Sequence, residues 1–115
     1  MTGAKIDLGQ KDLYRPDWAA YKVEQHAEHF AHLVGDQIRE YHQATGQFGV
    51  VAANFDTELF GHWWFEGVRW LGMVLRHLSV NPEVELMTAS AYIDKAPTPA
   101  ALPLPESSWG AGGSH

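Results

Sequence analysis

Apolar residues in the first half of the chain recur at steps of three and four, which is the spacing of one face of a helix. The positions are Val23, Ala27, Phe30, Val34, Ile38 and Tyr41. Pro16 and Asp17 suit a helix start, because proline fits the first turn and a carboxylate is favoured at the positive end of the helix dipole. Gly46 suits a left-handed cap at the other end. The pattern predicts a helix from about Pro16 to Ala44, in which Gly35 costs roughly 1 kcal/mol relative to alanine.

Two short apolar runs in the second half are typical of strands that are buried on both faces. They are Phe48–Ala53 and Val84–Met87. Between them, a second apolar stripe predicts a helix from near Trp63 or Glu66 to Leu78, which Asn81 and Pro82 would end. The stripe consists of Leu71, Val74, Leu75 and Leu78.

The remaining segments predict one short helix and an irregular tail. Thr88 or Ser90 suits the cap of a single helical turn through Tyr92 and Ile93. The proline-rich segment 96–105 is expected to be extended, and 107–113 is expected to be a Trp- and Gly-rich loop. Helices that alternate with strands predict an α/β fold with a parallel sheet. Two strands alone do not form a stable parallel sheet, so we expect a part of a larger fold.

Composition removes several classes of function. The 115 residues include 8 basic and 14 acidic side chains, for a net charge of −6. This balance lacks the positive surface that binds nucleic acid. The absence of cysteine excludes disulfides and thiolate metal sites. No uncharged apolar run is long enough to span a membrane, and the first eleven residues do not resemble a secretion signal. We therefore expect a cytoplasmic protein that does not bind membranes.

Three histidines at steps of three, His26, His29 and His32, raise the question of a metal site. Steps of three drift around a helix, so His26 and His32 do not stack on one face. A solvated helix surface explains them better. We expect no metal and no cofactor.

The best candidate for chemistry follows the first predicted strand. Asp56 comes directly after that run, Glu58 two residues later, and His62, Trp63 and Trp64 soon after. Functional groups of α/β folds lie at the carboxyl ends of strands. Carboxylates beside large aromatic rings suit sugar chemistry, in which one carboxyl acts as a general acid and rings stack on sugars. The alternative is that Asp56 and Glu58 are carboxylates placed at a helix start for dipole and capping reasons.

The segment from Phe55 to Gly67, FDTELFGHWWFEG, resembles a signature block of glycoside hydrolase family 57. Within the family the block is most similar to that of the 1,4-α-glucan branching enzymes, and α-amylases and 4-α-glucanotransferases are related. The stretch Leu13–Asp17 and the segment Ser108–Gly113 resemble flanking parts of the family pattern. The resemblance implies an incomplete, seven-stranded (β/α) barrel of the TIM type, of which this chain would hold about two βα units and the Trp/Gly-rich loop.

The resemblance also implies roles for individual residues. Asp56 corresponds to the general acid/base of a retaining mechanism on an α-glucan substrate. Glu58, His62, Trp63 and Trp64 would shape the sugar site, and Trp109 would contact the glucan chain. Trp70 is expected in the core. Adjacent tryptophans point in different directions on a helix, so one of Trp63 and Trp64 is expected to pack while the other faces the cleft.

The family's nucleophile lies on an earlier strand, so residues 1–115 are expected to be a single segment of the C-terminal part of the catalytic domain, cut at both ends. Such a segment is expected to be inactive alone, because one carboxylate does not supply both catalytic roles. Its partner would be the upstream catalytic segment. The alternatives are an α-amylase or 4-α-glucanotransferase of the same family, and an inactive remnant or one half of a split protein.

Overall fold

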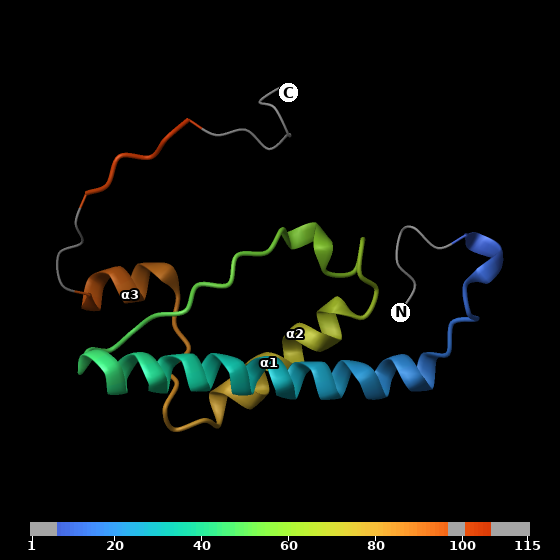
Figure 1. The fold of residues 1–115 in the computed structure, drawn as a ribbon, viewed down its shortest axis with the longest axis horizontal. Helices are drawn as coiled ribbons and strands as arrows, with labels where there is room; N and C mark the ends of the chain where they lie inside the picture. Colours follow the sequence, from blue (N-terminus) through green and yellow to red (C-terminus); the bar gives the residue numbers. More distant parts are fainter. Residues whose placement is uncertain (1–6, 97–100, 107–115) are drawn as a thin grey trace.

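The fold was analysed in a computed structural model, which describes residues 7–96 and 101–106. Three α-helices run in chain order: α1 (Pro16–Thr45), α2 (Gly67–Ser79) and α3 (Ala89–Lys95). Two 3₁₀ turns, η1 (Leu8–Gln10) and η2 (Thr57–Leu59), precede α1 and α2. α1 forms the long base of the molecule, and α2 crosses it near its middle (Figure 1). α3 lies toward the C-terminal end of α1.

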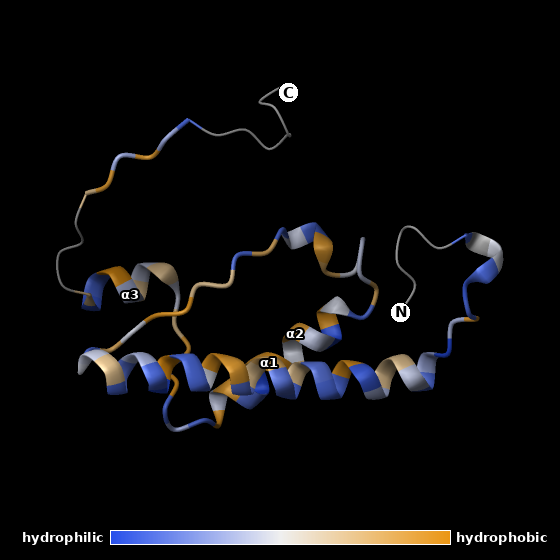
Figure 2. Ribbon diagram, viewed as in Figure 1, coloured by the Kyte–Doolittle hydropathy of each residue, from blue (hydrophilic) through white to orange (hydrophobic). Residues whose placement is uncertain are grey.

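The long predicted helix is confirmed at both ends. Pro16 begins α1 and Asp17 lies in its first turn. Gly46 ends α1 in the left-handed region, with a φ of 70°, and its N–H donates to the carbonyl oxygen of His42 at 2.8 Å. Glycine adopts this conformation without the steric cost that a Cβ brings. Hydrophobic positions recur along α1 among hydrophilic ones, as the spacing requires (Figure 2).

The core lies where α2 packs on α1. Its buried residues are Val23, Ala27, Ala31, Val34, Trp70, Val74 and Leu78. Ala27 and Ala31 of α1 belong to the same core cluster as Trp70 of α2. The prediction that Trp70 is a core residue is confirmed, since its exposed fraction is 6%. Tyr41 and Leu75, which the stripes placed on the apolar faces, are each 45% exposed because they lie beyond this contact.

The two predicted strands are wrong for the described residues. The segments Phe48–Ala53 and Val84–Met87 are without regular secondary structure, and the one bridge recorded is isolated, between Phe60 and Trp64. The first segment is extended and runs back above α1 (Figure 1). The physical reason is that a strand needs a neighbour for its N–H and C=O groups, and neither segment has one among the described residues. The regular elements of the described residues are therefore all helices, and the α/β barrel stays a prediction.

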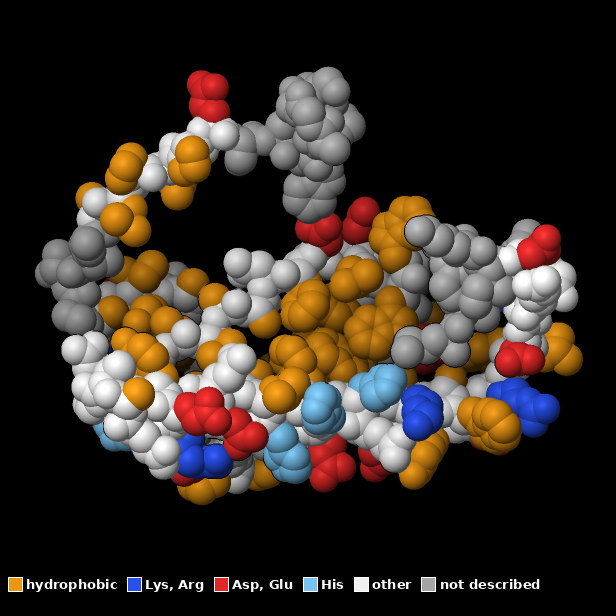
Figure 3. Space-filling model, viewed as in Figure 1, with side chains coloured by type: hydrophobic (Ala, Val, Ile, Leu, Met, Phe, Trp, Pro, Cys, Tyr) orange, Lys and Arg blue, Asp and Glu red, His pale blue; other side chains and the backbone are white. Residues whose placement is uncertain are grey.

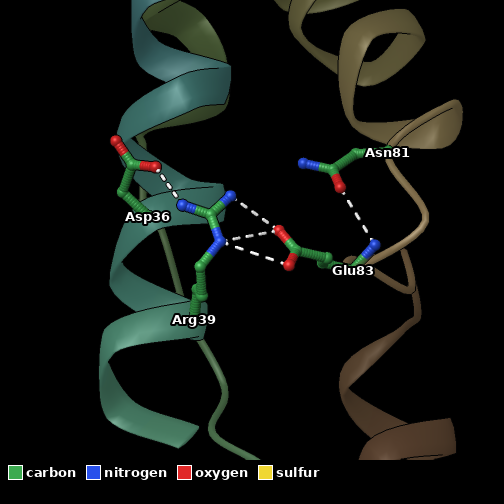
Figure 4. A network of polar contacts seen from close by, with 4 residues as sticks. All are labelled: Asp36, Arg39, Asn81 and Glu83. Atoms are coloured by element: carbon green, nitrogen blue, oxygen red, sulfur yellow. Dashed lines mark hydrogen bonds and ion pairs between the residues drawn. The ribbon is translucent and has the colours of Figure 1, made fainter. Parts of the chain in front are cut away.

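The segment after α2 is fastened to α1 by a polar network (Figure 4). The guanidinium of Arg39 donates to Glu83, with the shortest N–O distance at 2.6 Å, and to Asp36 at 2.8 Å. The side-chain oxygen of Asn81 accepts from the backbone N–H of Glu83 at 2.9 Å. This network holds the turn that ends α2 against α1.

The prediction that Thr88 caps a short helix is confirmed. Its hydroxyl oxygen accepts from the N–H of Ala91 at 3.2 Å. α3 is longer than the single turn expected, because it runs on to Lys95. Residues 101–106 are without regular secondary structure, while the rest of the proline-rich segment and the Trp/Gly-rich loop lie outside the described residues. No helix in the described part of the chain combines the length and apolar character needed to cross a membrane.

Candidate functional site

Asp56 lies where the extended segment turns into η2. Its φ and ψ are −63° and 129°, and its backbone oxygen accepts from the N–H of Leu59 at 3.0 Å. Its side chain makes no capping hydrogen bond to η2, and the residue is exposed. η2 is only three residues long, so there is little helix dipole for a carboxylate to stabilise. The capping explanation therefore has little support at Asp56, and its carboxylate is presented to solvent.

A tight turn after η2 sets the direction of the next residues. Gly61, at a φ of 96°, donates its N–H to the carbonyl oxygen of Trp64 at 2.9 Å. The N–H of Trp64 in turn donates to the carbonyl oxygen of Leu59 at 2.8 Å. A Cβ at Gly67 would lie 2.9 Å from the Trp64 ring, so a glycine is needed for the ring to pack there. The turn thereby directs Trp64 toward the start of α2.

The structure separates the two adjacent tryptophans. Trp64 is half-buried and lies 5.2 Å from the Trp70 ring, measured between ring centroids. Trp63 is 71% exposed. Its indole N–H donates to a carboxylate oxygen of Glu58 at 3.2 Å, and the His62 ring stands edge-on to it with the centroids 4.9 Å apart. The prediction that one of the two packs is confirmed for Trp64. Trp63 is the exposed one, and that it faces a substrate cleft stays a prediction.

Behind the site, aromatic rings join the turn to the core. Phe55 and Phe60 contact each other and both contact Trp70, at centroid distances of 5.5 to 6.4 Å. Phe30 of α1 meets Trp70 from the other side at 5.0 Å. Figure 3 shows hydrophobic side chains gathered on this face above α1. Since Phe55 directly precedes Asp56, these contacts fix the backbone that carries the candidate acid/base.

The segment before α1 also reaches the start of α2, just after the predicted site, which the sequence analysis missed. The hydroxyl of Tyr14 donates to Glu66 at 2.7 Å and so joins residues that are 52 positions apart. This hydrogen bond, together with partial burial and the negative charge of Glu66, raises the pKa of Tyr14 above its ordinary value. The one feature of the sequence that could have indicated this contact is that both residues fall in stretches that resemble the family pattern. The spacing alone did not pair them.

Two shallow hollows lie away from Asp56. One, of about 370 Å³, lies between the C-terminal half of α1 and the extended segment, with Tyr41, Val50 and Tyr92 in its lining. The other borders Arg39, Phe48 and Glu83. The described residues include no group of three His, Asp or Glu side chains arranged to hold a metal ion. Neither hollow contains a member of the predicted site.

The described residues thus bring one set of predicted site residues together. Asp56, Glu58, His62 and Trp63 are exposed on one turn, and Trp64 packs behind them. Trp109 lies outside the described residues. Retaining glycosidases need two carboxyl groups about 5–5.5 Å apart. The turn offers the Asp56 carboxylate, the Glu58 carboxylate, which accepts the Trp63 indole N–H, and an exposed aromatic surface.

Comparison with known proteins identifies relatives that are much longer. A 1,4-alpha-glucan branching enzyme of Thermococcus kodakarensis is 45% identical over 116 residues, which take in this whole chain and 17% of that enzyme. A probable 1,4-alpha-glucan branching enzyme of Mycobacterium tuberculosis is 38% identical over 112 residues, or 97% of this chain and 21% of that protein. This chain therefore spans about a fifth of the length of these relatives. No family model matches it.

Solved structures agree with the sequence relatives. The crystal structure of a GH57 branching enzyme from Thermococcus kodakaraensis, in complex with glucose, superposes with a TM-score of 0.76 at 43% identity, covering 96% of this chain and 20% of that one. The alpha-amylase AmyC from Thermotoga maritima superposes with a TM-score of 0.80 at 39% identity, covering 96% and 21%. Over essentially all of its residues, this chain is a homologue of one segment of the glycoside hydrolase family 57 enzymes.

Proposed function

We propose that this chain is the segment that carries the acid/base of an α-glucan-acting enzyme, and that the reaction is 1,4-α-glucan branching. The observation that carries the proposal is the 45% identity to a branching enzyme across the whole chain. The position of Asp56 supports it, because the carboxylate is exposed at the end of an extended segment that the aromatic core holds in place. The proposed setting is glycogen or α-glucan metabolism in the cytoplasm.

In the proposed reaction, Asp56 acts twice. It first donates its proton to the departing 4-oxygen of an α-1,4 bond while a nucleophilic carboxylate attacks the anomeric carbon. The glycosyl–enzyme bond forms as the glycosidic bond breaks. Asp56, now ionised, then takes the proton of an incoming 6-hydroxyl, whose oxygen displaces the enzyme carboxylate. Trp63 and Trp109 are the proposed stacking contacts to the sugar rings, His62 lies beside Trp63, and Trp64 supports the site from behind.

The nucleophile is proposed to come from a segment outside these 115 residues. Glu58 is not the proposed nucleophile, because it lies two residues from Asp56 on the same turn and one of its carboxylate oxygens accepts the Trp63 indole N–H. The upstream catalytic segment is accordingly the proposed protein partner, and an α-glucan is the proposed substrate. Purified alone, the chain is expected to leave the iodine colour and the reducing ends of amylose unchanged. Turnover by the chain that Asp56→Asn abolishes would overturn this part of the proposal.

A second function, supported by the alpha-amylase AmyC superposition, is hydrolysis, and 4-α-glucan transfer is a third. The three reactions share the first step and differ in the acceptor, which is a 6-hydroxyl, water or a 4-hydroxyl. An inactive remnant or one half of a split protein is the alternative outside catalysis. Products distinguish them: branching creates α-1,6 links without new reducing ends, whereas hydrolysis creates reducing ends.

A chimera tests the proposal directly. The matching segment of the Thermococcus kodakarensis branching enzyme is replaced by this chain, and α-1,6 links and reducing ends formed from amylose are measured. We expect branching by the chimera, and a loss of kcat of at least about 100-fold in Asp56→Asn, because asparagine keeps the shape but does not donate the proton.

The matched control is Asp94→Asn, an exposed aspartate on α3. It should leave kcat unchanged, and melting temperatures should show that all three chimeras fold equally. A folded chimera in which Asp56→Asn retains full activity would overturn the assignment of the acid/base. Release of reducing ends without new α-1,6 links would favour the amylase alternative.

A further inference from the structure

The role of Glu58 follows from what its side chain contacts. Its carboxylate oxygen accepts the indole N–H of Trp63 at 3.2 Å, and its backbone oxygen accepts the backbone N–H of Trp63 at 3.4 Å. Glu58 therefore binds Trp63 through both its side chain and its main chain. An indole N–H is a donor only, so a carboxylate five residues earlier is a suitable acceptor to fix its orientation.

The ring that Glu58 holds is exposed rather than packed. Trp63 is 71% exposed, whereas its neighbour Trp64 packs against Trp70. An exposed tryptophan held at one edge presents a flat apolar face to solvent. The His62 imidazole packs edge-on against the same ring, at an interplanar angle of 86°, and so flanks the Trp63 indole on one side. An aromatic ring with a fixed orientation and a polar side chain beside it is suited to stacking on a sugar ring.

We propose that Glu58 is a positioning residue, which holds the Trp63 indole as a stacking platform for a sugar ring of the α-glucan bound beside Asp56. This inference rests on the proposed function for the identity of the ligand. It assigns Glu58 neither proton transfer nor attack on the sugar. Preorganisation explains the benefit, because a ring that is already held loses less rotamer freedom when the glucan binds.

The hydrogen bond is tested in the 115-residue chain, independently of any activity. The indole N–H resonance of Trp63, assigned with Trp63→Phe, should move upfield in Glu58→Ala, which removes the acceptor. It should move little in Glu58→Gln, whose amide oxygen accepts the same proton, and not at all in the exposed-site control Glu24→Ala. A Trp63 resonance that Glu58→Ala leaves in place would overturn the proposal.

The consequence for sugar binding is tested in the chimera with amylose. Glu58→Ala should raise KM by about 3- to 10-fold with kcat nearly unchanged, the size expected for a stacking contact of this kind. Glu58→Gln should restore the original KM. In a Trp63→Phe background, Glu58→Ala should have no further effect, since phenylalanine lacks the donor. Trp63→Phe removes the same bond from the other side, so it serves as the test if Glu58→Ala does not fold.

The outcomes separate this inference from the proposed function. Loss of kcat in Glu58→Gln as deep as in Asp56→Asn would make Glu58 a catalytic residue and overturn the inference. Additive effects of Glu58→Ala and Trp63→Phe would overturn it as well. If Asp56→Asn is silent, the proposed function fails, whereas the resonance of the Trp63 indole still decides whether Glu58 holds the ring.

Discussion

Gly35→Ala tests whether the turn after α2 prevents α1 from having a larger residue at position 35. A glycine inside a helix costs about 1 kcal/mol relative to alanine, so Gly35→Ala on an isolated helix should stabilise it by that amount. In the structure Gly35 is buried, and a Cβ built there would lie 2.9 Å from the side-chain nitrogen of Asn81. This approach is too close, so the Asn81 side chain has to move away.

The cost of that movement is the hydrogen bond that Asn81 makes. Its side-chain oxygen accepts from the N–H of Glu83 at 2.9 Å, and a bond of this kind contributes about 0.5–1.5 kcal/mol. The loss is therefore about as large as the gain in helix propensity. We expect Gly35→Ala to change the free energy of unfolding by less than about 0.5 kcal/mol in the natural background. In an Asn81→Ala background, where nothing blocks the Cβ, the same change should stabilise by about 1 kcal/mol.

Urea denaturation followed by far-UV circular dichroism measures all four proteins of this double-mutant cycle. The predicted coupling between the two sites is about 1 kcal/mol, well above the usual departure from additivity of distant sites. Gly72→Ala on α2 is the matched control, since a Cβ there would meet nothing within 4 Å, and it should stabilise in both backgrounds. Equal stabilisation by Gly35→Ala in both backgrounds would refute the reasoning.

Two further predictions concern the core and the polar network. Trp70→Ala should cost about 3–5 kcal/mol in thermal or urea unfolding, because it empties the centre of the aromatic cluster, whereas Leu75→Ala on the exposed side of α2 should cost under about 1 kcal/mol. Equal costs would show that the core is elsewhere. The hydrogen bonds from Arg39 lower the pKa of Glu83. The ionised Glu83 carboxylate therefore stabilises the fold above its unfolded pKa of about 4.3. This stabilisation is lost as the pH falls through the lower pKa that Glu83 has in the folded protein. Glu83→Gln should remove that part of the acid dependence of the melting temperature, and an unchanged acid profile would contradict the pairing.

The helices of this protein were predictable because their information is local. The hydrogen bonds of α1 join residues four apart, and the signals for its two ends, Pro16 in the first turn and Gly46 at the C-cap, are read from single residues. The stripe on its surface already indicated which face is buried. The same holds for the Thr88 cap of α3. Each of these features depends on residues within a few positions of one another, so no knowledge of the rest of the fold was needed.

The strands and the contacts of the site depend on distant residues, and here tertiary structure decided. The apolar run Phe48–Ala53 has the composition of a strand, but a ladder forms only with a neighbouring strand, and the described residues supply none. Composition does not tell Trp63 from Trp64, whereas the turn at Gly61 and the position of Trp70 on α2 do. Tyr14 and Glu66 meet because α2 crosses α1, a packing that no local spacing encodes. The sequence by itself determined the helices and the candidate acid/base. The packing of the aromatic rings behind Asp56 onto α1 was decided by tertiary structure, because Phe30 and Trp70 are far apart in the chain.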